Sequence, residues 1–181
     1  MKSILYRLPL LFSLLLVCIL PYQCQSQHPG TEKLVANEAF RKKINSYLNF
    51  SIPVMGVDEL NKNKKDYVIL DAREKEEFQV SHIPDAKYIG YSSLDKSALN
   101  LVSKDQKIVV YCSIGYRSEK VSEKLRIMGY KNVTNLYGSI FEWANEGLPL
   151  EDANGKPSKN LHAYNKSWSK WVDNKSIKKT W

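Results

Sequence analysis

Short apolar runs alternate with segments of helical spacing through the middle of the chain, and this alternation constrains the fold more than any other feature. Runs of strand character lie near residues 53–55 and at 67–71, 86–90, 107–111 and 132–136. The run KIVVY is apolar from its second residue onward, as expected for a strand covered on both faces. Segments of helical character separate these runs and lie at 74–80, 116–128 and 139–145. The pattern predicts an α/β fold with a parallel sheet of about five strands and helices on both faces.

The N-terminal sequence indicates export. The first seven residues carry two basic side chains and no acidic one, and residues 8–20 are almost wholly apolar. Because this run is shorter than the roughly 20 residues that span a membrane, residues 1–26 are interpreted as a secretory signal peptide. A buried N-terminal helix is the alternative. Cleavage follows Ser26, or Cys24 becomes the lipid-modified first residue of a lipoprotein. We expect a periplasmic protein, or one anchored through Cys24 outside the inner membrane or at the outer membrane.

Three regions follow this leader. Residues 27–52 form an N-terminal segment with an amphipathic helix, residues 53–150 form the domain, and residues 151–181 form a linker and an aromatic, basic tail. Three tail residues are spaced to share one face of a helix: Tyr164, Trp168 and Trp171. Packing of this face onto the domain is the favoured interpretation, and contact with a membrane interface is the alternative.

The charge distribution bears on the class of partner. The chain carries a net charge of +8, but Lys and Glu alternate along most of its length. This pattern is typical of a solvated surface and predicts no stripe for nucleic acid. In an exported domain the positive charge also favours anionic substrates or a membrane surface.

The cysteines single out one residue. Of the three in the chain, Cys18 lies in the leader and Cys24 at its end, so only Cys112 lies in the predicted domain. A solitary cysteine in an exported protein is a candidate reactive thiol, with an inert buried cysteine as the alternative. The histidines lack metal-ligand spacing, so we predict neither a disulfide in the domain nor a metal site.

The segment that follows the strand at 107–111 predicts how this thiol is activated. Cys112 comes directly after the strand, and a helix begins a few residues later. Backbone N–H groups at a helix N-terminus stabilise an anion, so the pKa of Cys112 is expected to be lowered. Gly115 allows the loop to curl so that successive N–H groups point inward. Arg117 is expected at the rim, where its guanidinium can hold an oxyanion with two hydrogen bonds.

The segment from Cys112 to Arg117 resembles the active loop of rhodanese domains, Cys-x-x-Gly-x-Arg/Thr. The resemblance continues in family order over residues 53–150, which makes the set of motifs specific. The other matching segments are Asp71-Ala72-Arg73, Glu77-Phe78, Ser81-His82-Ile83-Pro84-Asp85-Ala86, Gly138-Ser139, Trp143 and Gly147-Leu148-Pro149.

The chain also departs from the family pattern. Three glycines of the family are replaced at turn positions, by Ser81, Asp85 and Ser139. Position 113 is Ser, where thiosulfate-specialised members often carry Arg, and the loop contains no Lys. The fold is therefore expected to be rhodanese-like, while thiosulfate is not marked as the preferred donor.

The resemblance implies a sulfurtransferase that carries sulfur as a persulfide on Cys112. A donor such as thiosulfate, a polysulfide or a persulfide supplies the sulfur, a thiol or cyanide accepts it, and no cofactor takes part. The implied substrate-binding residues form the rest of the loop: Ser113, Ile114, Gly115, Tyr116, Arg117 and Ser118. Asp71 and Arg73 are interpreted as a polar pair that supports the loop, with Glu77 as a candidate third member. A direct role of this pair in catalysis or binding is the alternative.

Two other functions compete with this one. A non-catalytic binding or persulfide-carrier module would use the same loop without turnover. Phosphatase or arsenate-reductase chemistry uses a Cys-x5-Arg loop, whereas the loop here is one residue shorter and suits a sulfur atom better than a tetrahedral anion.

Overall fold

The computed structural model describes residues 30–181, so the predicted leader, including Cys24, lies outside the described residues. A five-stranded parallel sheet forms the centre, in the order β1-β5-β4-β2-β3. Its strands are β1 (Val54–Met55), β2 (Val68–Asp71), β3 (Lys87–Tyr88), β4 (Lys107–Tyr111) and β5 (Asn132–Leu136). The predicted α/β fold with about five parallel strands is confirmed.

Helices cover both faces of this sheet. They are α1 (Glu38–Asn45), α2 (Val57–Asn63), α3 (Lys75–Val80), α4 (Tyr116–Ile127) and α5 (Ser139–Asn145), with short 3-10 helices at η1 (Lys64–Asp66), η2 (Lys96–Leu99) and η3 (Ser169–Trp171). Along β4, Val109 and Tyr111 enter one apolar cluster, whereas Ile108 and Val110 enter the other. This alternation explains the continuous apolar run, because each face of the strand meets its own layer of helices.

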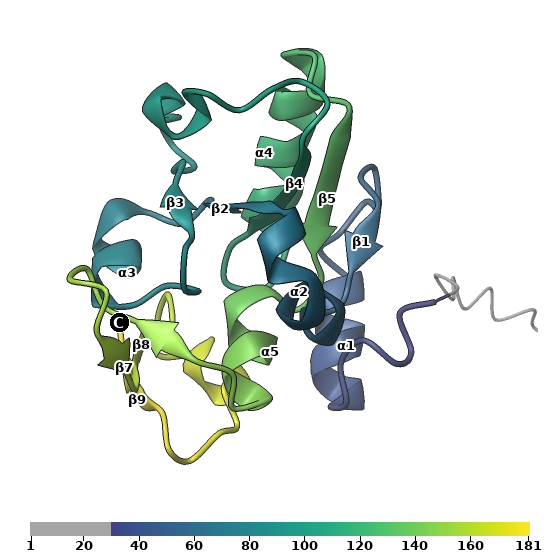
Figure 1. Ribbon diagram of the computed structural model, residues 1–181. Helices are drawn as coiled ribbons and strands as arrows, with labels where there is room; N and C mark the ends of the chain where they lie inside the picture. The colour runs from purple at the N-terminus through teal and green to yellow at the C-terminus, as the bar shows by residue number, and fades with distance from the viewer. Residues whose placement is uncertain (1–29) are drawn as a thin grey trace, which may run out of the picture.

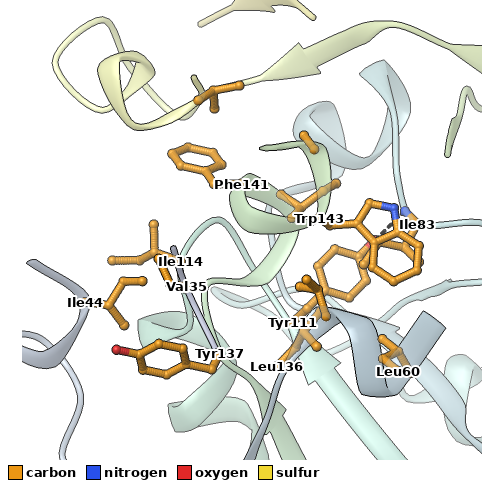
Figure 2. Close-up of a cluster of buried hydrophobic side chains, with 14 of the residues drawn as sticks. Val35, Ile44, Leu60, Ile83, Tyr111, Ile114, Leu136, Tyr137, Phe141 and Trp143 are labelled. Atoms are coloured by element: carbon orange, nitrogen blue, oxygen red, sulfur yellow. Dashed lines mark hydrogen bonds between the residues drawn. The ribbon is translucent and has the colours of Figure 1, made fainter. Parts of the chain in front are cut away.

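The larger cluster joins the sheet to α1, α2 and α5 (Figure 2). Trp143 is fully buried in it and donates its indole N–H to the carbonyl of Pro149 at 2.8 Å. Figure 2 shows Ile114 near Ile44, so this loop residue contributes its side chain to the core. The smaller cluster lies under α4, where Val121 and Leu125 are buried.

The C-terminal region differs from the expected linker and helical tail. Strands β6 (Leu150–Glu151) and β7 (Pro157–Ser158) pair antiparallel, and β8 (Asn160–His162) pairs parallel with β9 (Lys178–Thr180). Figure 1 shows these strands gathered at one end of the molecule, next to α3. The segment is therefore part of the folded unit.

The predicted helix over the tail aromatics is wrong, and the expected packing holds for Trp168 and Trp171 but not for Tyr164, which is 51% exposed. Tyr164 has a φ of 65°, which is left-handed and incompatible with a helix, and only the 3-10 turn η3 follows. Trp168 and Trp171 still pack against the larger cluster, with the Trp171 ring stacked 5.4 Å from Phe40. Buried Val172 adds to this contact. Tertiary packing has thus overridden the local helical spacing.

Candidate functional site

The site is built around the end of the central strand. Cys112 follows β4 directly, and α4 begins at Tyr116. Since β4 is the middle strand of the sheet, this turn lies at the carboxyl edge, where open α/β sheets bind their ligands. The Cys112 residue is 1% exposed, so its sulfur lies at the bottom of the site rather than on the surface.

The carbonyl groups of the loop are bound by neighbouring elements. The N–H groups of Ile140 and Phe141, in the first turn of α5, donate to the carbonyls of Cys112 and Ser113, both at 3.2 Å. Gly115 has a φ of 123°, a conformation that favours glycine, and its N–H lies 3.2 Å from the Cys112 Sγ. The loop therefore turns a donor toward the thiol, as the inward curl predicted.

A second set of contacts fixes the Gly115 peptide. Its carbonyl lies 3.0 Å from the Ser118 hydroxyl and accepts from the Asn135 side-chain amide, also at 3.0 Å. Asn135 and Ser118 are also joined at 2.7 Å, and both are fully buried. These two side chains hold the strained turn. Asn135 was not predicted, because it lies on the next strand, β5.

Ser139 shows what one departure from the family pattern does. Its φ of 51° is left-handed, which explains why glycine suits this turn. The Ser139 hydroxyl accepts from the N–H of Cys112 at 3.1 Å and donates to the carbonyl of Leu136 at 2.8 Å. The serine thus anchors the backbone of Cys112 to the end of β5.

The environment favours the thiolate form of Cys112. Burial alone raises the pKa of the thiol, because a low-polarity environment disfavours its charge. The positive charge of Arg117, the hydroxyl and N–H of Ser118, and the N–H of Gly115 act in the opposite direction. Together they outweigh burial, so the pKa of Cys112 is lowered.

The sequence predicts that Arg117 lies free at the rim. In the structure its guanidinium is instead bound by neighbouring side chains. Its Nη1 lies 2.5 Å from Glu77 Oε2, and its Nη2 lies 2.8 Å from Oε1 and 2.9 Å from the Ser113 hydroxyl. Both partners of the ion pair are buried. The fork that would hold an oxyanion is therefore occupied by a carboxylate from α3. Arg117 acts on the thiol through its charge.

Asp71 and Arg73 form a separate buried pair. The guanidinium contacts both carboxylate oxygens at 2.6–3.1 Å, and its Nη2 also donates to the carbonyl of Ser81 at 2.6 Å. The pair ties β2 to the end of α3. That the pair supports the loop stays a prediction. Glu77, the candidate third member, forms its ion pair with Arg117.

The histidines in the described region lie outside the reacting centre. His82 stacks on Phe78 at 3.8 Å and bonds the carbonyl of the same residue at 3.0 Å through Nδ1. His162 Nδ1 lies 3.9 Å from the Glu77 carboxylate. Within residues 30–181, no group of three or more His, Cys, Asp or Glu side chains is arranged to hold a metal ion. No helix in that range is long and apolar enough to cross a membrane.

A pocket of about 340 Å³ opens above the thiol. Its floor is the loop, and its walls are mainly aromatic. The lining residues are Tyr47, Tyr91, Cys112, Ser113, Ile114, Tyr116, Arg117, Tyr164 and Trp168. Tyr47 and Tyr91 were not predicted from the sequence, because the residues of the pocket come together only through the tertiary fold.

The fold and loop define an α/β protein with one activated thiol at the carboxyl end of a parallel strand. The Rhodanese-like domain family matches residues 57–146. A protein from Allochromatium vinosum named Sulfurtransferase is 35% identical over 86 residues, which cover 48% of this chain and 79% of that protein. The chain therefore belongs to the rhodanese-like domain family.

Two further similarities define how far the comparison extends. The adenylyltransferase and sulfurtransferase UBA4 of Candida albicans is 29% identical over 104 residues, or 54% of this chain, but the chain spans only 24% of that protein. The structure of the BH2092 protein from Bacillus halodurans aligns with a TM-score of 0.51 and 24% identity. The alignment covers 65% of this chain and 86% of that one, and the likeness is one of fold.

Proposed function

We propose that this chain is a sulfurtransferase that carries sulfane sulfur as a persulfide on Cys112. The observation that carries this proposal is the Gly115 N–H, held 3.2 Å from a buried sulfur whose pKa is lowered. An inert buried cysteine has no need of a left-handed turn that aims a donor at it. The names of the relatives from Allochromatium vinosum and Candida albicans support the same activity.

The transfer takes place in two balanced steps. The Cys112 thiolate attacks the outer sulfur of a donor R–S–SH, a new S–S bond forms, and the donor's S–S bond breaks to release R–S⁻. The product is Cys112–S–SH. An acceptor thiolate then attacks the outer sulfur, leaves as a persulfide and regenerates the Cys112 thiolate. Each step conserves charge and needs no external oxidant or reductant.

Each loop residue has its own role in binding the anionic sulfur. The backbone N–H groups of Gly115 and Ser118 face the thiol. Arg117 supplies a fixed charge. Ile114 holds the loop to the core through its side chain, and Tyr116 forms part of the pocket wall. Asp71 and Arg73 support the loop by tying β2 to the end of α3.

The intact mass of the purified chain after treatment with inorganic polysulfide tests this proposal. We expect a gain of one sulfur atom, lost again when a thiol acceptor is added. Cys112→Ser should gain none while keeping its circular dichroism spectrum. A wild-type chain that gains no sulfur, or a Cys112→Ser variant that still turns over, would refute the assignment. Hydrolysis of an aryl phosphate dependent on Cys112 would favour phosphatase chemistry instead.

We further propose that the chain is exported, on the basis of its basic and then apolar N-terminus. N-terminal sequencing of protein from the native host gives the mature end. A start at Gln27 indicates a periplasmic form, and a lipid-modified Cys24 indicates a membrane-anchored form. Retention of residues 1–20 on a cytoplasmic protein would refute export.

A further inference from the structure

The walls of the pocket come partly from outside the rhodanese-like region. The family match ends at residue 146, yet Tyr164 and Trp168 line the pocket, as does Tyr47 from before the match. The Tyr47 ring packs edge-on against Trp168 at 5.4 Å and against Tyr116 at 6.1 Å. The two extensions of the chain therefore meet at the pocket and add aromatic side chains to its wall.

The pocket has the wrong charge for a small dianion. Its only lining cation among the described residues is Arg117, which is paired with Glu77 through two nitrogens and lies 5.2 Å from the Tyr164 ring. A dianion such as thiosulfate would have to displace this carboxylate or do without a guanidinium partner. Burying an unpaired charge is unfavourable, so the lining selects against such a ligand.

The same pocket suits an organic molecule. A volume of about 340 Å³ lies within the range of roughly 300–1,000 Å³ found for sites that enclose small organic ligands. Aromatic side chains favour flat rings, which they contact in stacked or edge-to-face arrangements. Lys43 lies outside the lining, 4.9 Å from the Tyr47 ring and 5.8 Å from that of Trp168. Besides the paired Arg117, a second cation thus lies next to two of the aromatic rings of the wall.

We propose that the physiological sulfur substrate is an organic thiol that bears an aromatic ring, bound as the persulfide when it donates and as the thiol when it accepts. The inference rests on the sulfurtransferase function proposed above. The ring lies among Tyr47, Tyr116 and Trp168, and the sulfur reaches Cys112. Transfer follows the balanced steps given above, with the aromatic group as R.

Two matched acceptors test this specificity. Enzyme loaded from inorganic polysulfide is mixed with 2-phenylethanethiol or with propanethiol, and loss of sulfur from Cys112 is followed by mass. We expect kcat/KM to be at least about tenfold higher for the aromatic thiol, as two to three ring contacts allow. Equal rates for the two thiols, or a preference for propanethiol, would overturn the proposal.

Variants of the wall identify the source of the preference. Trp168→Leu and Tyr47→Leu keep an apolar side chain but remove a ring, and each should lower the ratio of the two rates by about threefold to fivefold. Trp181→Leu is the matched control, because this tryptophan is 56% exposed and does not line the pocket. Equal slowing of both thiols in the wall variants would indicate a structural role only.

A binding measurement separates this inference from the proposed function. Methyl 2-phenylethyl sulfide cannot exchange sulfur, so its binding does not depend on catalysis. Its titration, followed by isothermal calorimetry, should give saturable binding that is weaker in Trp168→Leu and absent for methyl propyl sulfide. Saturable binding by a chain that accepts no sulfur would refute the sulfurtransferase function and leave the aromatic pocket standing. Sulfur loading without thioether binding would refute the pocket alone.

Discussion

The ion pair between Glu77 and Arg117 offers a direct measure of how the loop is held. Glu77→Gln keeps the shape of the side chain but removes its charge. The new amide nitrogen then faces guanidinium N–H groups that accept nothing, and one of the two short contacts of 2.5 and 2.8 Å is lost. Because Glu77 is 3% exposed and Arg117 is 9% exposed, the lost contact is largely shielded from water.

The size of the effect follows from this burial. Removing one partner of a buried ion pair costs about 3–5 kcal/mol. Arg117 retains the Ser113 hydroxyl at 2.9 Å and the Tyr164 ring at 5.2 Å, so we expect the lower end, about 3 kcal/mol. With a urea m-value of about 2 kcal/mol/M, the unfolding midpoint should fall by about 1.5 M at pH 7. Glu76→Gln is the matched control, because this exposed residue lies on the same helix.

The pH dependence provides an independent check. Burial raises the pKa of Glu77, but the hydrogen bonds and charge of Arg117 outweigh this effect and hold it below its ordinary value. Its stabilising contribution is therefore fully present above the unfolded pKa of about 4.3 and is lost as the pH falls through the folded pKa. The gap between wild type and Glu77→Gln should close in acid. A midpoint shift below about 0.5 M at pH 7, or a gap that does not change with pH, would refute the argument.

Three other predictions follow from the loop and the tail. The pKa of Cys112, measured as the alkylation rate against pH, should lie below the ordinary value of about 8.5 and rise in Arg117→Met. An unchanged or lower pKa in that variant would show that the charge of Arg117 does not reach the sulfur. Gly115→Ala has room for its Cβ, whose nearest neighbour would be 3.5 Å away, but its φ of 123° should cost about 2 kcal/mol in urea unfolding and slow alkylation. Full stability would mean that the turn relaxes. Deletion of residues 160–181 should lower the melting temperature by about 10 °C or more and increase dye binding, because it removes buried Leu161 and Val172 and exposes the apolar cluster that they pack against. An unchanged melting temperature with loss of binding to anionic vesicles would instead favour the membrane interpretation of the tail.

The local sequence predicted those parts of the molecule that local interactions determine. Strands β2, β4 and β5 lie within a residue or two of the apolar runs that predicted them, and the curl at Gly115 follows from one residue type at one position. Cys112 could be singled out because the chain contains so few cysteines. These features can be predicted without knowing which distant segments of the chain contact one another.

The remaining features depend on contacts between segments far apart in the chain. Glu77 and Arg117 are 40 residues apart, so neither the carboxylate that occupies the guanidinium nor the resulting neutral pocket could be read from the loop. Tyr47 and Trp168 meet from opposite ends of the chain. The helical spacing of the tail aromatics was misleading, because pairing of β8 with β9 determines the path of that segment.

The depth of Cys112 also has a bearing on oxidative damage. A thiolate of lowered pKa is the form that peroxides convert to sulfenic acid and then irreversibly to sulfinic and sulfonic acids. Here the residue is 1% exposed and lies beneath a pocket with mainly aromatic walls. The thiol is therefore chemically reactive but little exposed to solvent. If the chain transfers sulfur as proposed above, the donor and the acceptor reach Cys112 through this pocket. A persulfide stored at this depth is shielded from bulky protein thiols and should outlast one formed on an exposed cysteine.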